Sequence, residues 1–146
     1  MGNGITHVCA LSGFSVLLND IAAVRINEGL ATISGNLARQ VSRQRISEEQ
    51  RQAAIKRIIP AMTLDELADC DLVIEAATEK EEIKRKIFST LCPSLKPAAV
   101  IGTNTSSISI TRLAAATDRP EHFIGIHFMN PVPLMELVEV IRGIAT

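Results

Sequence analysis

The feature that most constrains the fold is the alternation of short apolar runs with helical patterns along the second half of the chain. The runs "DLVIEAA" (71–77), "AAVIGTNT" (98–105) and "HFIGIHFM" (122–129) have the length and apolar character of strands covered on both faces. Helical patterns at 80–91 and 109–117 separate them. Strands and helices that alternate through short connections favour an α/β fold with a parallel, doubly wound sheet.

The first half of the chain predicts a helix, a strand and then a long helix. Residues 3–11 predict a short helix closed by Gly13, and "FSVLLND" (14–20) predicts a strand. A long helical pattern follows from about Ala22 to Arg43. Its apolar stripe consists of Ile26, Leu30, Ile33 and Leu37. We therefore expect this helix to bury one face.

Capping signals mark the elements that follow. Ser47 with Gln50 forms a capping box that predicts a helix over 48–58, so the two helices together predict a helical hairpin inserted after the strand, at about 22–58. The remaining predicted elements are a weak strand at 57–62, a short helix capped by Thr63 with Glu66, and a last strand at 134–141.

Composition narrows the classes of protein. The 146 residues, 47% hydrophobic and 21% charged, suit one globular domain and not comfortably two. A net charge of -1 and 3% aromatic residues offer neither a basic surface nor a base-stacking platform, so no nucleic-acid partner is expected. No apolar run has membrane-spanning length and no signal peptide opens the chain, so no membrane partner is expected.

The three cysteines favour a reducing compartment. Cys9, Cys70 and Cys92 are widely spaced, form no CxxC pair and leave one thiol over. They are most simply small buried hydrophobic residues of a cytoplasmic protein. No metal site is expected.

Polar residues gather where the predicted strands end. Asp20, Glu75, residues 104–107 and residues 127–130 each lie at or just after the carboxyl end of a strand. Ligands of doubly wound sheets bind at that edge, so this clustering predicts a site. The alternative is chance, because loops are polar in any case.

The start of the chain carries half of a nucleotide-binding motif. Gly2 at a helix start, followed by Asp20 at the end of the next strand, fits the last glycine and the acidic residue of a dinucleotide-binding unit. In such a unit the glycine lets the helix pack against its strand, and the acidic residue binds ribose hydroxyls. Without the earlier glycines, the pair is equally compatible with a helix start and a turn.

Short polar side chains follow the predicted strand 98–105. "TNTSS" (103–107) supplies donors for a nicotinamide or a substrate oxygen. The same stretch could simply cap the following helix through Ser107 or Ser109. The two roles are compatible.

His127 and Glu139 form the strongest candidate for catalysis. Oxidation of a secondary alcohol needs a base that titrates near neutral pH, which favours histidine, and a carboxylate behind the imidazole fixes its tautomer. Pro131 and Pro133 would stiffen the turn between the two residues. The alternatives are a histidine with a purely structural role, or a pairing with Glu136, which has the opposite strand parity.

Three stretches resemble the NAD-binding domain of the 3-hydroxyacyl-CoA dehydrogenases, close to the bacterial 3-hydroxybutyryl-CoA dehydrogenases. They are "DCDLVIEAATEKEEIKRKIF", "TNTSSISIT" and "HFIGIHFMNPVPLMELVEVIRG". The resemblance covers all 146 residues and implies a Rossmann-like fold with an inserted hairpin. It implies NAD-dependent oxidation of 3-hydroxyacyl-CoA to 3-ketoacyl-CoA in fatty-acid or butanoate metabolism, or activity of a related enzyme on free hydroxy acids.

The resemblance assigns roles to individual residues. His127 would be the base and Glu139 its partner, while Ser106 and Asn130 would bind the substrate oxygen and the nicotinamide region. For the cofactor it adds Asp20 on the adenine ribose, favouring NAD over NADP, with Gly2, Glu79 and Lys84 nearby. For acyl-CoA it adds Asn36 and Arg43 on the hairpin, at positions where some members have Ser and Lys.

Two departures from the family pattern lead to a further expectation. The family's first strand and its glycine loop lie before Gly2, and its helical second domain, which makes a homodimer, begins after Thr146. Losing a central strand removes several buried side chains at about 1.5–3 kcal/mol each, from a total of about 5–15 kcal/mol. We expect this polypeptide alone to be unstable, to bind NAD weakly and to be inactive, as a fragment of an enzyme or a non-catalytic remnant.

Overall fold

The computed structural model describes residues 1–146, which form two compact units. The first unit comprises Met1–Met62 and Asn130–Leu134, and the second comprises Thr63–Met129 and Met135–Thr146. The elements in chain order are α1 (Gly2–Leu11), β1 (Val16–Asn19), α2 (Ala23–Ser42), α3 (Glu48–Lys56), β2 (Ile58–Ala61), η1 (Asp65–Leu67), β3 (Leu72–Glu75), α4 (Glu81–Leu91), η2 (Cys92–Ser94), β4 (Val100–Thr103), α5 (Ile110–Ala114), η3 (Pro120–His122), β5 (Phe123–Phe128) and β6 (Val138–Arg142). None of the helices is both long and apolar enough to cross a membrane.

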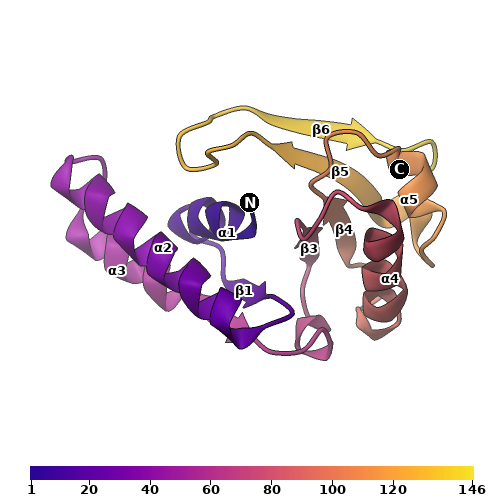
Figure 1. Ribbon diagram of the computed structural model, residues 1–146, viewed down its shortest axis with the longest axis horizontal. Coiled ribbons are helices and arrows are strands. Elements are labelled where there is room, and N and C mark those ends of the chain that lie inside the picture. The colour runs from indigo at the N-terminus through magenta and orange to yellow at the C-terminus, as the bar shows by residue number, and fades with distance from the viewer. The chain divides into compact units, whose positions relative to one another are not determined.

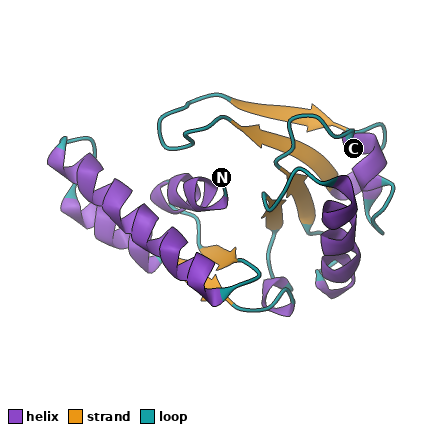
Figure 2. Cartoon of the chain, viewed as in Figure 1, coloured by secondary structure: helices purple, strands orange, loops and turns teal.

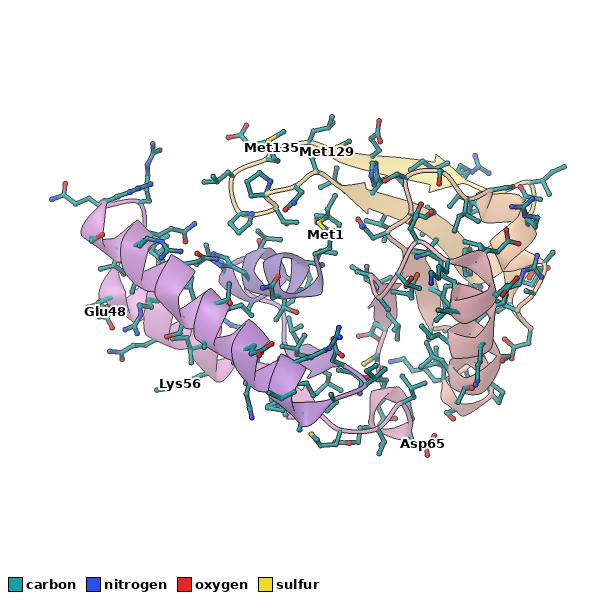
Figure 3. All side chains as sticks on the ribbon, in the orientation of Figure 1. Met1, Glu48, Lys56, Asp65, Met129 and Met135 are labelled. Atoms are coloured by element: carbon teal, nitrogen blue, oxygen red, sulfur yellow. The ribbon has the colours of Figure 1, made fainter.

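The first unit contains a two-stranded sheet and three helices (Figure 1). Strands β1 and β2 pair in parallel, and the helical hairpin of α2 and α3 connects them, as predicted. Glu48 and Lys56 mark the two ends of α3 (Figure 3). The predicted capping box is present, because Ser47 and Gln50 bond each other's backbone N–H groups.

The core of the first unit follows the predicted stripe. Ile26, Ile33 and Leu37 on α2 are buried, and Ile33 and Leu37 pack with Ala10 of α1 and Ala54 of α3. Helix α1 ends before Gly13, whose φ of 100° lies in the left-handed region that glycine adopts without strain. The sequence therefore predicted both the buried face of α2 and the end of α1.

The second unit is built on a four-stranded sheet in the order β3-β4-β5-β6 (Figure 2). Strands β3, β4 and β5 are parallel, as predicted, whereas β6 runs antiparallel to β5. The connection between these two strands, which includes the labelled Met129 and Met135, contains no helix (Figure 3). A parallel pair needs a long crossover, so this connection favours the antiparallel arrangement.

Three elements differ most from those expected. The last strand begins at Val138 instead of residue 134, because the proline-containing turn occupies the residues before it, where Leu134 N donates to Pro131 O. The segment after Thr63 forms only a 3₁₀ turn, although Glu66 accepts from Thr63 N as a capping box requires. Helix α5 ends at Ala114, earlier than predicted.

Aromatic and aliphatic side chains form the core of the second unit. Phe88 of α4 and Phe123 of β5 are fully buried and meet edge to face, with ring centroids 5.1 Å apart. Gly125 lets α5 approach β5, because a Cβ there would lie 2.8 Å from Ile110 Cδ1. This close packing fixes α5 and the loop before it against the sheet.

Candidate active site

His127 and Glu139 lie directly opposite each other in the antiparallel pair of β5 and β6. His127 Nδ1 is 2.7 Å from Glu139 Oε2, and their side chains are 18% and 50% exposed. The strand register thus brings together two side chains that are twelve positions apart in the sequence. The competing carboxylate, Glu136, lies before β6 and is exposed.

The hydrogen bonds of His127 define its tautomer. A carboxylate only accepts, so Nδ1 carries the proton that is shared with Glu139. The other ring nitrogen, Nε2, is then an acceptor, and the Ser106 hydroxyl donates to it over 3.0 Å. Nε2 of His127 is therefore the atom that could take a proton from a substrate hydroxyl that displaces Ser106.

Glu79 holds the loop that carries Ser106. This residue lies in the connection between β3 and α4. Its Oε1 accepts hydrogen bonds from Thr105 Oγ1 (2.6 Å), Ser106 N (2.9 Å), Ser107 N (3.1 Å) and Ser107 Oγ (3.0 Å). Desolvation raises the pKa of Glu79, but these hydrogen bonds together outweigh it and hold the pKa below its ordinary value.

Lys84, which the resemblance puts beside the cofactor, is held in a buried ion pair. Its side chain is fully buried, and its Nζ donates to Glu75 Oε2 at 2.5 Å and to Thr103 Oγ1 at 3.4 Å. Thr103 Oγ1 also donates to Glu75, and Glu75 Oε1 accepts from Ala77 N. The ammonium therefore ties α4 to the ends of β3 and β4 and has no surface left for a cofactor.

Asn104 ties the end of β4 to the end of β5. Its Oδ1 accepts from Phe128 N at 2.8 Å, next to His127 in the sequence. The predicted cap is made by Ser109, whose hydroxyl accepts from Arg112 N. The "TNTSS" stretch is therefore held mainly by side chains from other elements, while Ser109 begins the helix.

A shallow cavity of about 310 Å³ opens beside the dyad. Residues 105–110 form one wall, and His127, Glu139 and Ile141 form the other. Ser106 and His127 thus face a space that can admit a small polar group.

The start of α1 offers unpaired backbone donors in the first unit. No side chain caps this helix, so the N–H groups of its first turn, at Gly2, Asn3 and Gly4, have no helical partner. A Cβ at Gly2 would meet nothing within 4 Å. Asp20 directly follows β1, the strand that comes after α1 in the chain.

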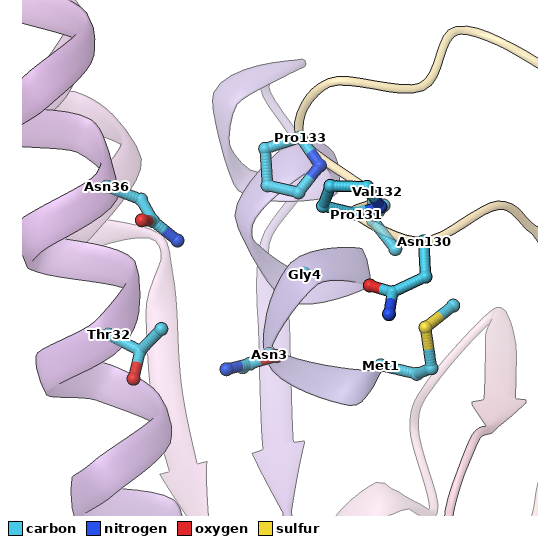
Figure 4. Close-up of a pocket in the computed structure, with 9 residues that line it drawn as sticks. All are labelled: Met1, Asn3, Gly4, Thr32, Asn36, Asn130, Pro131, Val132 and Pro133. Atoms are coloured by element: carbon cyan, nitrogen blue, oxygen red, sulfur yellow. The ribbon is translucent and has the colours of Figure 1, made fainter.

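A second cavity, of about 130 Å³, lies between α1, α2 and the segment 130–133 (Figure 4). Figure 4 shows Thr32 and Asn36, one turn apart on α2, facing Asn3 of α1. Asn130 lines this cavity together with the prolines that follow it. Arg43 does not line this cavity and lies exposed at the end of α2, seven positions after Asn36.

The comparison with protein families decides the assignment. Residues 1–146 match the family described as 3-hydroxyacyl-CoA dehydrogenase, NAD binding domain. The chain belongs to this family.

Relatives and a solved structure of this family match the chain over its whole length. The chain is 70% identical over 146 residues to a 3-hydroxybutyryl-CoA dehydrogenase of Bradyrhizobium diazoefficiens, covering 100% of this chain and 50% of that protein. It is 44% identical to the 3-hydroxyadipyl-CoA dehydrogenase of Escherichia coli, covering 31% of that protein. The crystal structure of (S)-3-hydroxybutyryl-CoA dehydrogenase from Ralstonia eutropha matches with a TM-score of 0.97 at 44% identity, over 100% of this chain and 52% of that chain.

These matches confirm the predicted Rossmann-like α/β fold. The chain spans about half the length of the first of these relatives and of the solved structure.

The first unit of this NAD-binding domain has groups that fit part of the cofactor. The unpaired N–H groups and positive end of α1 suit a pyrophosphate, and the space above Gly2 leaves room for it. Asp20 is partly exposed and makes no side-chain hydrogen bond, so its carboxylate is available to ribose hydroxyls.

Gly4 is a residue that sequence reasoning missed. A Cβ at this position would lie 2.9 Å from Val132 Cβ, so the glycine allows the 130–134 segment to pack on α1. The close approach expected at Gly2 is found here instead. A second glycine within the first helical turn was the available signal, because glycine is unfavourable inside a helix unless close packing requires it.

Proposed function

We propose that this domain belongs to an NAD-dependent L-3-hydroxyacyl-CoA dehydrogenase, which oxidises 3-hydroxyacyl-CoA to 3-ketoacyl-CoA. The observation that supports this most strongly is the chain of hydrogen bonds from Glu139 through His127 to Ser106. The names of its relatives support the substrate class. NAD, when bound, supplies the hydride acceptor.

The acid-base chemistry is assigned to the dyad. Nε2 of His127 takes the proton of the 3-hydroxyl group, and the carboxylate of Glu139 stabilises the imidazolium that results. The substrate hydroxyl replaces Ser106 as the donor to Nε2. The Ser106 hydroxyl is then free to donate to the substrate oxygen, where negative charge develops.

Cofactor binding is assigned to the first unit, with Gly2 at the pyrophosphate and Asp20 at the adenine ribose. The carboxylate of Asp20 would repel a 2′-phosphate, which favours NAD over NADP. We also assign Ser106 and Asn130 to the substrate oxygen and the nicotinamide region, and Glu79 to the vicinity of the cofactor, as the resemblance implies.

Acyl-CoA binding is assigned to the helical hairpin, about residues 22–58. Asn36 offers an amide to the first-unit cavity, and exposed arginines follow it at positions 39, 43 and 45. Their guanidinium groups suit the phosphates of CoA. A free hydroxy acid would not use this basic surface, so the arginines favour the CoA thioester.

Substitutions in the full-length enzyme that carries this domain test the assignment. His127→Ala is expected to abolish turnover while leaving NAD affinity nearly unchanged. Glu139→Gln is expected to lower kcat by about 10³–10⁴-fold, because the imidazolium loses its partner. Glu136→Gln is the matched control, since that carboxylate lies outside the dyad. Turnover that survives His127→Ala would contradict the proposal, as would equal activity on free 3-hydroxy acids.

Compartment and assembly are proposals too. The three cysteines are all free, which suits a reducing cytoplasm. We propose that the full-length enzyme is a homodimer formed through a helical second domain, which size-exclusion chromatography with light scattering would test.

A further inference from the structure

The Ser106 hydroxyl owes its position to its backbone. A serine side chain rotates about one χ1 bond with three staggered positions, so its oxygen can reach only a small region fixed by the backbone. Ser106 and Ser107 are exposed and lie in a loop, outside the ladder of β4 and before α5. Solvent-exposed loop backbone has little intrinsic order.

Glu79 fixes the backbone of the β4–α5 loop through hydrogen bonds. Its Oε1 bonds the backbone N–H groups of Ser106 and Ser107 in the β4–α5 loop. The same oxygen accepts from the hydroxyls of Thr105 and Ser107, so one carboxylate oxygen gathers three consecutive residues. Hydrogen bonds to a carboxylate are about twice as strong as neutral ones.

We propose that Glu79 is a positioning residue that holds the Ser106 hydroxyl on Nε2 of His127. This inference rests on the proposed function and goes beyond a cofactor contact for Glu79. The residue does not touch the reacting atoms. It acts through Ser106, whose hydroxyl it holds 3.0 Å from Nε2.

Steady-state kinetics of the full-length enzyme provide the first test. Glu79→Ala is expected to lower kcat by about 10- to 100-fold, the size of effect that follows a misplacement of about 1 Å. The KM for acyl-CoA should stay within a factor of about two, since the proposal gives Glu79 no role in binding the substrate. Glu79→Gln should lose less activity than Glu79→Ala, because its amide oxygen still accepts hydrogen bonds.

The pH profile distinguishes positioning from general support of the fold. Loss of the Ser106 contact changes the surroundings of Nε2, so the acidic limb of kcat/KM should differ between Glu79→Ala and the wild type. The matched control is Glu82→Gln, an exposed glutamate three residues on, which should keep the wild-type profile. A lower melting temperature with an unchanged profile would overturn the proposal. A raised KM for NAD with an unchanged kcat would overturn it as well, because it would make Glu79 a cofactor ligand only.

A spectroscopic test separates this inference from the proposed function. In the ¹⁵N-histidine-labelled enzyme, Glu79→Ala should shift the Nε2 signal of His127, assigned with His127→Gln, whereas Glu82→Gln should not. This holds whatever reaction the enzyme catalyses. An unchanged Nε2 signal in Glu79→Ala would overturn the positioning role, whereas absence of dehydrogenase activity in the wild type would overturn only the proposed function.

Discussion

The two units of the domain carry their functional groups in different ways. In the first unit, the groups assigned to the cofactor are backbone N–H groups, open space at Gly2 and a carboxylate without a side-chain partner. In the second unit, Ser106, His127 and Glu139 already bond one another. The first unit therefore offers a surface completed by its ligand, whereas the second holds a network assembled before any ligand binds.

The largest effect is expected from breaking the buried ion pair of the second unit. Lys84→Met would leave the Glu75 carboxylate buried without its cation. We expect the free energy of unfolding to fall by about 3–5 kcal/mol, measured by urea unfolding of the full-length enzyme. Lys96→Met is the matched control, because the Lys96–Asp71 pair is solvent-exposed and should contribute about 0–1 kcal/mol. Equal effects of the two substitutions would show that burial of the pair is irrelevant.

A smaller effect is expected from the glycines of the first unit. Gly4→Ala would place a Cβ 2.9 Å from Val132 and should destabilise the enzyme by about 1–3 kcal/mol.

Gly2→Ala meets no neighbour, so it should leave the free energy of unfolding unchanged or slightly raised. It should nevertheless weaken NAD binding by narrowing the approach to the helix N-terminus, as calorimetric titration would detect. Equal NAD affinity in wild type and Gly2→Ala would contradict the assignment.

The smallest effect is expected from His7 in the core of the first unit. Desolvation lowers its pKa, and the hydrogen bond with Gln40 only partly opposes this. Below about pH 6.5 the unfolded chain takes up a proton that the folded chain refuses. The contribution of neutral His7 to the free energy of unfolding is therefore complete above that pH. It is lost as the pH falls towards the pKa that His7 has in the folded chain. Urea midpoints measured between pH 7.5 and pH 5 should fall less steeply in His7→Gln than in the wild type or in the control His122→Gln.

Local signals predicted most of the elements and the central pair of the site. Apolar runs with flanking caps gave the order of helices and strands, because period and capping are properties of neighbouring residues. The dyad was predictable because His127 lies near the end of one strand and Glu139 interrupts the next apolar run. The pairing is present, although β6 and Glu139 are exposed and not buried as that run suggested.

Interactions between distant segments were beyond the sequence. The burial of Lys84 is explained by the approach of β3 and β4 to α4, and the charged pattern "KEEIKRK" around it carries no signal for that burial. The hydrogen bond from Ser106 N to Glu79 joins two loops that are 27 positions apart in the sequence. Likewise, the contact of Gly4 with Val132 depends on a segment far along the chain.

Glu139 lies on an edge strand, which affects how the activity of the enzyme should depend on temperature. β6 is the outermost strand, paired only with β5, and all five of its residues are exposed. Outer strands open locally at a lower free-energy cost than the strands they border. Warming should accordingly detach the carboxylate from the imidazole while the rest of the sheet is intact, so that turnover declines before the domain melts.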